Sequence, residues 1–528
     1  MNIKDMIYKV RTNANMSREQ FAELLGVSRQ SVQKWENGDC APELDKIIKI
    51  SKYFDISLDT LVLGNDNRLT EEAKYNKKIR PNYANIHNEE FYTSNLDVEY
   101  TQSIEEGLDI EAYKDVFSAV AGLPKDEIKK RIGDALFDVV LNAKQKEDYK
   151  YVEPSELEKI KVLRKEHEYE KTQPSKEQLE EKIHGAWMGR ICGCMLGKTV
   201  EGIRTNELIP FLKGSDNYPM HRYILRSDIN DEIIEKYSYP FAQRHYADEI
   251  DGMPYDDDTN YVILSQVIIE KHGRDFTARD VSQAWLDYQP RYAYWTAERV
   301  AFCNFINGYE PPASAIYKNP FREWIGAQIR GDYYGYINPG DPQAAAEMAF
   351  RDASISHIKN GIYGEMFASA MIAAAAVTNN IEDIIKAGLA EIPHTSRLYE
   401  AITEVIDGFK NGAEQKSCFD NIHKQYDEYT GHGWCHTIPN AMIVAASLLY
   451  GGGDYGKSIC MAVETGFDTD CNGATVGSVL GMANGIKSIP EYWTKPINDT
   501  LYTTIFGFDK VKISDRVKLT LKHIDSKN

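Results

Sequence analysis

Two aspartates one residue apart, Asp468 and Asp470, are the side chains best placed for chemistry in this sequence. They precede a glycine- and alanine-rich run that is typical of a buried helix. Paired carboxylates beside small polar side chains form an oxygen-rich site suited to Mg²⁺, Mn²⁺ or Ca²⁺. An aspartate at a helix entrance also commonly caps the helix, so a metal site needs partners elsewhere in the chain.

Regularly spaced glycines indicate a first partner, Glu201, for the Asp468–Asp470 pair. They recur every fourth residue in residues 185–197, where Glu201 continues the spacing, and again in residues 473–485. Residues four apart share one face of a helix, where each interior glycine costs about 1 kcal/mol relative to alanine. We therefore expect the two glycine faces to pack closely and to bring Glu201 beside the aspartate pair. The alternative is two separate buried helices that tolerate glycine.

An acidic triplet, Asp256-Asp257-Asp258, is the second partner. Residues 248–258 contain six carboxylates and no Lys or Arg, and adjacent aspartates repel unless a cation or a helix N-terminus compensates. Thr259 begins an apolar run with helical spacing, so the triplet leads into a predicted core helix; a solvated acidic loop is the alternative. The motifs together predict two divalent ions bridged by carboxylates, an arrangement that polarises a substrate and activates water.

The glycine ladder ending in Glu201, the Asp-Asp-Thr of residues 257–259 and the loop of residues 468–473 resemble the ADP-ribosylglycohydrolase family, over residues 180–510. That family includes the ADP-ribosylhydrolases and the dinitrogenase reductase-activating glycohydrolase. The resemblance implies an all-α fold with a centre of two Mg²⁺ ions, with Mn²⁺ as the alternative. It also implies hydrolysis of the N- or O-glycosidic bond at C1″ of an ADP-ribosyl group, whose ribose hydroxyls rest on the metals.

The family motifs carry roles over to the matching positions of this chain. The implied metal ligands are Asp256, Asp257, Asp258, Asp468 and Asp470, and the implied catalytic residues are Glu201, Asp257 and Asp470. Two positions depart from the family pattern: Asp256 replaces a Thr or Ser and adds negative charge, and Cys471 replaces a Thr. A thiol is a poor ligand for Mg²⁺, so the sequence argues against Cys471 as a direct ligand and shifts the preference toward Mn²⁺.

Substrate-binding candidates lie between the metal motifs. An Arg in the Gly- and Tyr-rich residues 326–341 indicates recognition of a phosphate or a planar ring. The matching family loop, of Asn-Gly-x-x-Met-Arg type, lines the substrate cleft, but Ile325 replaces its Asn, which argues against ordinary ADP-ribose recognition. Ser356-His357 resembles the family's Thr-His helix, with a structural histidine as the alternative. The predicted substrate-binding residues are Gln328, Arg330, Asp332, His357 and His436.

A separate unit occupies the N-terminus. Residues 17–20 form a predicted capping box, Gly26 ends that helix, Ser28 caps the next, and Gly38 ends it. Two short helices joined by a Gly-containing turn predict a helix-turn-helix, whose second helix enters the major groove. The predicted DNA-binding residues are Ser28, Arg29, Gln30, Gln33 and Lys34.

Residues 16–61 resemble the Cro/C1-type (XRE-like) helix-turn-helix family nearly throughout. The resemblance implies sequence-specific binding of DNA, and such domains usually act as dimers, so we expect a homodimer. A helical module used only for protein contacts is the alternative. Residues 1–64 carry nine Lys/Arg and nine Asp/Glu, so the net charge of -19 lies in the remainder. That charge argues against non-specific nucleic-acid binding by the whole chain.

The chain of 528 residues is too long for one core, and we predict a mainly α protein in three parts. They are a helix-turn-helix domain in residues 1–64, a linker and helical extension in 65–178, and an all-α catalytic domain in 179–528. In the middle part, residues 65–102 lack a steady period and are a predicted linker, and the rest is a predicted solvated helical spacer. Eight scattered cysteines, with no signal peptide or membrane span, predict a cytoplasmic protein.

Three functions agree with these features. The first is a metal-dependent glycohydrolase that cleaves an ADP-ribosyl or related ribosyl bond and is joined to a DNA-binding module. The second is a transcription regulator whose glycohydrolase-like domain senses an ADP-ribose-like ligand. The third is a hydrolase of another ribosyl bond, such as that of a nucleoside. The intact carboxylates favour catalysis over sensing, whereas Ile325 and Cys471 keep the third function open.

Overall fold

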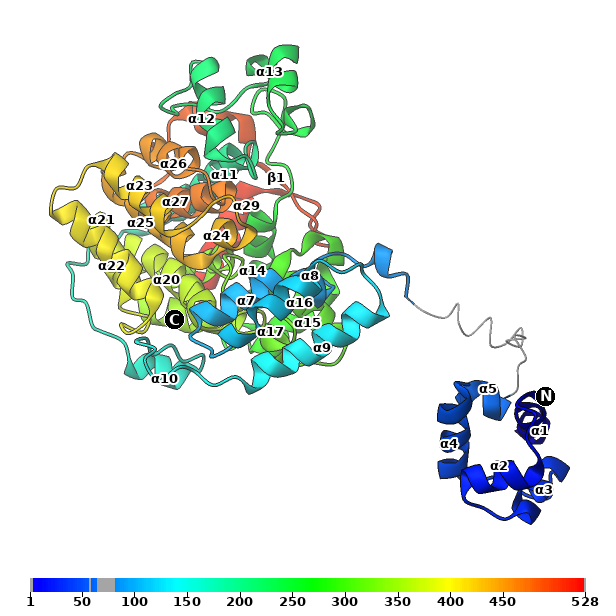
Figure 1. Ribbon diagram of the computed structural model, residues 1–528. Helices are drawn as coiled ribbons and strands as arrows, with labels where there is room; N and C mark the ends of the chain where they lie inside the picture. The colour runs from blue at the N-terminus through cyan, green and yellow to red at the C-terminus, as the bar shows by residue number, and fades with distance from the viewer. Residues whose placement is uncertain (1–2, 57, 64–80, 527–528) are drawn as a thin grey trace. The chain divides into compact units, whose positions relative to one another are not determined.

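The computed structural model describes residues 3–56, 58–63 and 81–526 (Figure 1). The chain divides into two compact units, Met1–Ala84 and Asn85–Asn528. Both are mainly α-helical, which confirms the predicted fold class.

The N-terminal unit is a small bundle of helices. They are α1 (Ile3–Asn13), α2 (Arg18–Leu25), α3 (Arg29–Asn37), α4 (Leu44–Phe54) and α5 (Leu58–Leu63). The predicted capping box of α2 is present, because Ser17 Oγ accepts from the backbone N–H of Gln20, and Gln20 Oε1 accepts from that of Ser17. Gly26 and Gly38 end α2 and α3 in the left-handed conformation that glycine adopts readily.

Apolar faces of these helices meet in one core and fix the orientation of α3. The buried members are Ile7, Val10, Phe21, Ala22, Leu25, Val32, Trp35, Ile47, Ile50 and Leu61. Glu36, on α3, pairs with Arg11 and with Arg18, each at 2.6 Å, and so ties α3 to α1 and α2. The opposite face of α3 remains in solvent.

Over residues 85–526 the large unit contains helices and one short hairpin. η1 (Tyr83–Asn85) spans the boundary between the two units, and the first elements of the large unit are η2 (Tyr92–Ser94), α7 (Leu96–Glu105), η3 (Glu111–Tyr113), α8 (Lys114–Ala121), α9 (Glu127–Asn142) and α10 (Leu157–Val162). The next are α11 (Lys176–Lys198), α12 (Thr205–Gly214), η4 (Arg226–Asp228), α13 (Asp231–Lys236), η5 (Phe241–Gln243), α14 (Asp257–His272), α15 (Ala278–Tyr288), η6 (Arg291–Ala293), α16 (Thr296–Ile306), α17 (Ala313–Ile316), η7 (Gln328–Arg330), α18 (Asp332–Tyr336), α19 (Pro342–Ala353) and α20 (Lys359–Ala375).

The remaining elements complete the large unit. They are α21 (Ile381–Leu389), α22 (Arg397–Lys410), α23 (Gln415–Gln425), α24 (Gly431–Cys435), α25 (Thr437–Gly451), α26 (Tyr455–Glu464), α27 (Thr469–Asn484), η8 (Ile486–Ser488), α28 (Glu491–Thr494), η9 (Lys495–Ile497), β1 (Thr500–Tyr502), β2 (Lys510–Lys512) and α29 (Ile513–Asp525). β1 and β2 pair antiparallel, with Leu501 opposite Val511.

Helices α14, α20, α25 and α27 run through the core of the large unit and are buried on nearly all sides. Because every face is covered, apolar and small residues occur all around them instead of in one stripe. The C-terminal half of α11 is equally buried, and it lies beside α27 (Figure 1). These helices form the frame on which the acidic motifs are placed.

Residues 85–162 are part of the large unit and do not form the solvated spacer that we expected. α7 begins at Leu96, inside the stretch 65–102 that the sequence predicts to be linker; residues 64–80 of that stretch lie outside the described residues. Helices α7, α8 and α9 share a small core of their own. Its buried members are Tyr92, Leu96, Ile110, Phe117, Val120, Leu136, Phe137 and Val140.

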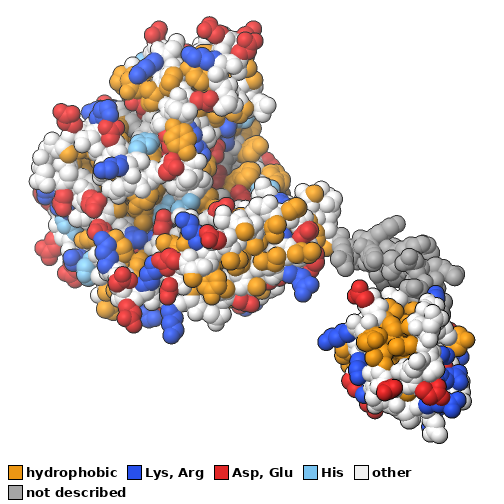
Figure 2. All heavy atoms as spheres, in the orientation of Figure 1, with side chains coloured by type: hydrophobic (Ala, Val, Ile, Leu, Met, Phe, Trp, Pro, Cys, Tyr) orange, Lys and Arg blue, Asp and Glu red, His pale blue; other side chains and the backbone are white. Residues whose placement is uncertain are grey.

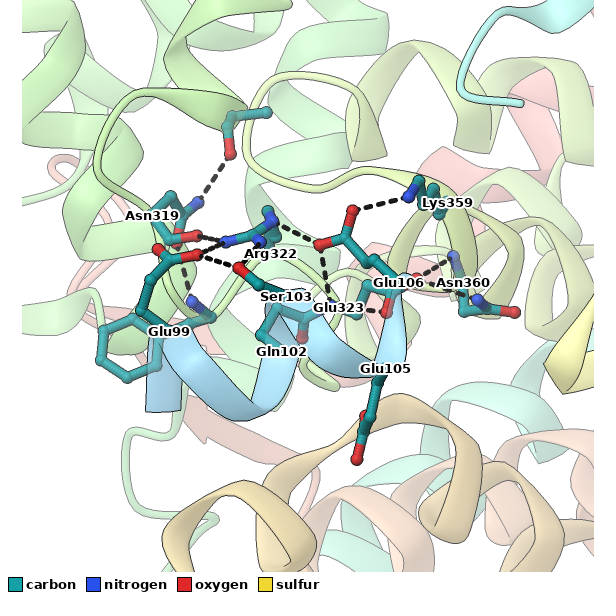
Figure 3. Close-up of polar contacts among 12 residues, drawn as sticks. Glu99, Gln102, Ser103, Glu105, Glu106, Asn319, Arg322, Glu323, Lys359 and Asn360 are labelled. Carbon is teal, nitrogen blue, oxygen red and sulfur yellow. Dashed lines mark hydrogen bonds and ion pairs between the residues drawn. The ribbon is translucent and has the colours of Figure 1, made fainter. Parts of the chain in front are cut away.

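A buried polar network anchors α7 to the rest of the large unit (Figure 3). Arg322 pairs with Glu99 at 2.8 Å and with Glu106 at 2.6 Å, and Gln102 Nε2 donates to Glu323 Oε2 at 2.6 Å. All five side chains are buried. The face of α7 that meets Arg322 and Glu323 is therefore polar, and the burial of that face could not be read from apolar spacing.

Removing the Arg322 side chain is expected to destabilise the large unit. Arg322→Ala leaves Glu99 buried without its cation and leaves Glu106 with Lys359 alone, which costs about 3–5 kcal/mol. Lys130→Ala is the control, because Lys130 and Asp134 pair at 3.2 Å with both side chains more than 40% exposed, and such a pair contributes about 0.5 kcal/mol or less. Urea unfolding followed by tryptophan fluorescence measures both, and equal midpoints for the two variants would contradict the assignment.

The surface of the large unit carries mixed charge. Figure 2 shows Asp and Glu side chains interspersed with Lys and Arg over the visible face. The net charge of -19 is therefore not gathered into one patch on that face. Among the residues that the structure describes, no helix is long and apolar enough to cross a membrane.

Candidate metal centre

Helices α11 and α27 meet backbone to backbone along their glycine faces. A Cβ atom added to Gly193 would lie 2.0 Å from the carbonyl oxygen of Gly473, and the other glycines of residues 185–197 are similarly close to α27. Approach this close leaves no room for a side chain, so the predicted packing of two glycine faces is confirmed. At the end of the ladder, Thr469 Oγ1 donates to the carbonyl of Gly197 at 2.9 Å. The end of α11 is thereby fixed against the start of α27.

A tight turn between α26 and α27 places the Asp468–Asp470 pair. Gly466 and Phe467 both adopt positive φ, at 76° and 58°, and the latter conformation is uncommon for a residue with a side chain. Asn440 Oδ1 accepts a hydrogen bond from Asp468 N at 3.2 Å. The turn starts α27 only a few residues after α26 ends, so both carboxylates stand at one helix start.

The acidic triplet occupies the start of α14. Asp256 is the N-cap residue, and its Oδ1 accepts from the backbone N–H of Asp258 at 2.9 Å. Asp258 Oδ2 lies 3.1 Å from Cys471 Sγ on α27. A carboxylate oxygen of Asp258, one of Asp470 and Cys471 Sγ all lie within 4.8 Å of one another. The structure therefore brings the triplet and the pair together, as the sequence predicts.

Glu201 follows the end of α11 and is held through its backbone. Its carbonyl oxygen accepts hydrogen bonds from Tyr239 Oη at 3.1 Å and Arg244 Nη2 at 3.0 Å. Removal from water, and next the charge of Asp256, raise the pKa of the Glu201 carboxyl to about 7. Glu201 can therefore hold or release a proton near neutral pH.

Repulsion among carboxylates dominates the electrostatics of the centre. Burial first, and neighbouring carboxylates next, raise the pKa of Asp257 and of Asp470 well above its usual range. Burial is also the largest cause of the raised pKa of Asp258 and of Asp468. Asp470 is 3% exposed, and its Oδ1 has no hydrogen-bond partner within the described ranges.

Two cationic side chains that sequence reasoning missed offset part of this charge. Arg190, on α11, bridges Asp258 at 3.0 Å and Asp332 at 2.8 Å. Lys198 Nζ donates to Asp256 Oδ2 at 2.7 Å. The additional negative charge at position 256 is thus matched by a lysine three residues before Glu201. Lys198 directly follows the last glycine of the ladder in the sequence, but its partner Asp256 is 58 residues away and is identified only by the structure.

The donor set fits divalent cations. The carboxylates of Glu201, the triplet and the pair outnumber the cations paired with them, and Asp470 Oδ1 is buried without a hydrogen bond from any described residue. Oxygen donors with excess negative charge bind Mg²⁺, Mn²⁺ or Ca²⁺. The individual ligand and catalytic roles of Glu201, Asp256, Asp257, Asp258, Asp468 and Asp470 remain predictions.

The raised pKa values predict an unusual dependence of stability on pH. Carboxyls of the unfolded chain lose their protons near pH 4.5, whereas Glu201 in the folded chain holds its proton to about pH 7. Between these values the folded state binds more protons, so stability is full at low pH and is lost as the pH rises through this window. In a chelator, we expect the midpoint temperature of thermal unfolding to decrease as the pH is raised from about 5 to about 8. Added Mg²⁺ or Mn²⁺ should raise this temperature again, and most at the higher pH.

Scanning fluorimetry measures this dependence directly. Asp468→Asn combined with Asp470→Asn removes two of the repelling carboxylates, so the double variant should show a smaller fall in chelator. A midpoint that rises over this pH range in chelator, or a fall of the same size in the variant, would contradict the electrostatic account.

The predicted substrate-binding residues are all buried. Arg330 is fully buried, and its guanidinium pairs with Glu298 at 2.8 Å and with Asp352. Asp332 is held by Arg190, as described above, and Gln328 is 1% exposed. The guanidinium of Arg330 already makes its hydrogen bonds within the protein, which argues against a contact with phosphate. Phosphate binding by Arg330 stays a prediction.

The two histidines among these candidates are buried. His357 Nδ1 lies 2.8 Å from Ser356 Oγ, and burial lowers the pKa of His357 well below its usual range. His436 is the N-cap residue of α25, and its Nδ1 accepts from the backbone N–H of Ile438 at 3.2 Å. The neighbouring Cys435 Sγ donates to Asp468 Oδ2 at 3.3 Å, so the chain at His436 adjoins the acidic centre.

Glu105, at the end of α7, reaches the same loop and was missed by sequence reasoning. Its Oε2 lies 3.0 Å from His432 Nε2 and 3.6 Å from His436 Nε2. Burial raises the pKa of Glu105, but the hydrogen bond from His432 and the interactions with the nearby His and Arg side chains together outweigh burial and lower this pKa to about 2. Trp324 Nε1 donates to His432 Nδ1 at 3.2 Å, so both histidines use Nδ1 as an acceptor and carry hydrogen on Nε2. Glu105 and His432 are hydrogen-bonded, whereas His436 Nε2 has no hydrogen-bond partner among the described residues, and one donor atom from each of the three lies within 4.8 Å of the others.

The candidate DNA interface lies on α3 of the N-terminal unit. Ser28 Oγ caps α3 by accepting from the backbone N–H of Ser31 at 3.1 Å. The side chains of Arg29, Gln30, Gln33 and Lys34 are exposed, and Arg29 pairs with Glu19 on α2 at 2.6 Å. Exposed Arg, Gln and Lys side chains on α3, the second helix of the helix-turn-helix, form the arrangement that contacts bases and phosphates.

Sequence models of two known families match this chain. The sequence model of the ADP-ribosylglycohydrolase family matches residues 175–519, and that of a helix-turn-helix family matches residues 7–61. A solved ADP-ribosylglycohydrolase-related protein complex aligns over 67% of this chain and 100% of its own, with 16% identity and a TM-score of 0.42.

Curated relatives match short stretches of the chain. The HTH-type transcriptional activator BcrR of Enterococcus faecalis is 31% identical over 87 residues, which are 16% of this chain and 43% of that protein. The phage repressor RstR of Vibrio cholerae is 33% identical over 61 residues, 12% of this chain and 54% of the repressor. An uncharacterized HTH-type regulator of Methanocaldococcus jannaschii is 31% identical over 65 residues, 12% of this chain and 98% of the regulator. The chain thus spans about half the length of the first two relatives.

Proposed function

This chain belongs to the ADP-ribosylglycohydrolase family and carries an N-terminal helix-turn-helix DNA-binding domain, and from that premise we propose that it is a metal-dependent glycohydrolase. The bond that it cleaves joins C1″ of an ADP-ribosyl or related ribosyl group to its acceptor. One observation carries the proposal: carboxylates at the starts of α14 and α27 meet in a buried centre near Glu201, and Asp470 Oδ1 has no hydrogen-bond partner among the described residues.

The chain's own residues have distinct tasks in this proposal. Asp257, Asp258, Asp468 and Asp470, with Asp256 beside them, would hold the divalent cations, Mg²⁺ or Mn²⁺. Such cations, when bound, neutralise charge and orient sugar hydroxyls. Glu201, whose pKa is about 7, takes a proton from the attacking water, whose oxygen bonds to C1″ as the glycosidic bond opens toward an oxocarbenium-like state. The acceptor leaves with the electron pair of that bond and takes up a proton from solvent.

Cationic and polar neighbours keep these carboxylates in place. Arg190 positions Asp258 and Lys198 positions Asp256 through the contacts at 3.0 Å and 2.7 Å. Arg330 is buried between carboxylates, and we assign it a positioning role for residues 326–332. Gln328, His357 and His436 remain the candidates for contact with substrate.

A second candidate function, hydrolysis of another ribosyl bond, rests on position 325. Ile325 is 2% exposed, and its backbone N–H donates to the carbonyl of Cys435 at 2.8 Å. It therefore offers no polar side chain where the family loop has an Asn. A nucleoside or another ribosyl compound would then fill the cleft in place of ADP-ribose.

Turnover of a substrate panel tests the proposal. The full-length protein is incubated with Mg²⁺ or Mn²⁺ and with ADP-ribosyl-Arg, ADP-ribosyl-Ser, ADP-ribosylated DNA and nucleosides, and products are separated by chromatography. We expect cation-dependent release of ADP-ribose from one of the ADP-ribosyl substrates. Release of a base from nucleosides alone would favour the second candidate. No turnover, together with DNA binding that changes with ADP-ribose, would favour a ligand-sensing regulator.

DNA binding through α3 gives a separate prediction. We propose that the protein regulates transcription in the cytoplasm and binds DNA as a homodimer. Arg29→Ala and Gln33→Ala should each weaken binding to a selected operator by about 1–3 kcal/mol, because each removes a contact to a base edge. Lys34→Ala should weaken binding to all DNA sequences alike. It should also reduce the slope of the logarithm of the binding constant against the logarithm of the salt concentration by about one. Lys52→Ala, an exposed lysine on α4, is the control; a loss equal to that of Arg29→Ala would contradict the assignment.

A further inference from the structure

Thiol groups lie inside the candidate metal centre at two positions. Cys471, in the first turn of α27, has its Sγ 3.1 Å from Asp258 Oδ2. Cys194 lies on α11 beside Gly193. Its Sγ, a carboxylate oxygen of Asp256 and one of Asp258 all lie within 4.8 Å of one another. Asp258 therefore belongs to two groups of donor atoms, and each group contains one sulfur.

The spacing of these atoms suits ligands of one ion. Ligands that lie about 2.0–2.3 Å from a metal are themselves about 3–4 Å apart. In the second group, Asp258, Asp470 and Cys471 each offer one donor atom within 4.8 Å of the others. Asp470 Oδ1 is a separate indication of a cation site, because this oxygen is buried and receives no hydrogen bond from the described part of the chain.

We propose that Cys194 and Cys471 are metal ligands, and that the centre selects a thiophilic divalent transition ion over Mg²⁺. This inference rests on the proposed function, because it concerns the same centre. On binding, each thiol releases its proton to solvent and the sulfur forms a bond to the ion. Thiolates favour ions such as Zn²⁺ and Co²⁺, whereas Mg²⁺ requires oxygen. The sequence argument against Cys471 as a ligand holds for Mg²⁺ and not for these ions.

Other cysteines of the same region show what a thiol outside the ligand set does. Cys435 Sγ donates to Asp468 Oδ2 at 3.3 Å but belongs to neither group of three donors. Cys192 precedes Cys194 by two residues on α11, and its Sγ donates to the carbonyl of Trp493 at 3.3 Å. Cys192 is as deeply buried as Cys194, so Cys192→Ser is a matched control.

Cobalt spectroscopy tests the ligand set without any measurement of activity. The full-length protein is stripped with a chelator and titrated with Co²⁺, and the near-ultraviolet band from sulfur-to-cobalt charge transfer is recorded. We expect the band in the wild type and in Cys192→Ser, a weaker band in Cys471→Thr, and none in Cys471→Thr combined with Cys194→Ser. We also expect Mg²⁺ to displace Co²⁺ from the double variant at concentrations about 100-fold lower than from the wild type.

The wild-type spectrum decides the proposal even if a variant fails to fold. Bound Co²⁺ that lacks the charge-transfer band would show an all-oxygen centre and would overturn the assignment of both thiols. A band that persists in the double variant would overturn it as well. Failure of the stripped protein to bind Co²⁺, Zn²⁺, Mn²⁺ and Mg²⁺ alike in calorimetry would instead contradict the proposed function.

Discussion

Replacing both Asp468 and Asp470 by Asn is expected to lower cation-dependent hydrolysis by at least about 10³-fold, a loss of about 4 kcal/mol in transition-state stabilisation. The physical reason is that Asn keeps the shape of Asp but removes the charge that holds a divalent cation. Initial rates at saturating and limiting substrate give kcat and kcat/KM for the variant.

The fold of this variant should survive the substitution. Both carboxyls have a raised pKa in the folded protein, so their removal relieves repulsion and should increase thermal stability in chelator. Asp454→Asn is the control, since Asp454 is an exposed N-cap of α26 whose hydrogen bond from Lys457 N an Asn can retain. Full activity in the double variant would rule out the proposed centre.

Gly193→Ala is expected to destabilise the large unit by more than about 4 kcal/mol and to abolish cation binding. The added Cβ would lie 2.0 Å from the carbonyl oxygen of Gly473, a backbone atom that cannot move without separating α11 from α27. The same separation would move Glu201 away from Asp470. Urea unfolding and calorimetric titration with Mn²⁺ measure the two effects.

Gly214→Ala is the matched control for this substitution. Gly214 also lies in a helix, α12, but an added Cβ would meet no atom within 4 Å. Because Ala is the better helix former, this variant should be as stable as the wild type or slightly more stable. Equal stability of Gly193→Ala and Gly214→Ala would show that the close helix contact is not required.

Much of the centre could be predicted because its signals are local. The glycine spacing of residues 185–197 and 473–485 encodes a helix contact directly, since only glycine permits such an approach. The capping box of residues 17–20 and the glycines that end α2 and α3 are equally local, and they located the helix-turn-helix.

Other parts could not be predicted because their partners are far apart in the sequence. The inner face of α7 is made of Glu99, Gln102 and Glu106, whose burial depends on Arg322 and Glu323. Polar residues without apolar spacing indicate a linker, and only the tertiary contacts show a buried helix. Pairing of Lys198 with Asp256 is hidden for the same reason.

The substrate side of the site was the least predictable part. Arg330 has the residue type of a phosphate ligand, but its guanidinium is surrounded by carboxylates from α16 and α19. A lone Arg in a glycine-rich loop carries no information on which buried acids will meet it. Glu105 likewise enters the region of His436 from α7, outside the residues that match the ADP-ribosylglycohydrolase family.

Calorimetric titration with ADP-ribose tests most directly the claim that this centre binds a ribosyl ligand through divalent cations. The full-length protein is titrated after loading with Mg²⁺ or Mn²⁺, and again after treatment with a chelator. The account predicts binding that is at least about 100-fold tighter in the loaded protein, and no such difference in the variant that combines Asp468→Asn with Asp470→Asn. Equal affinity with and without divalent cations in the wild-type protein would contradict it.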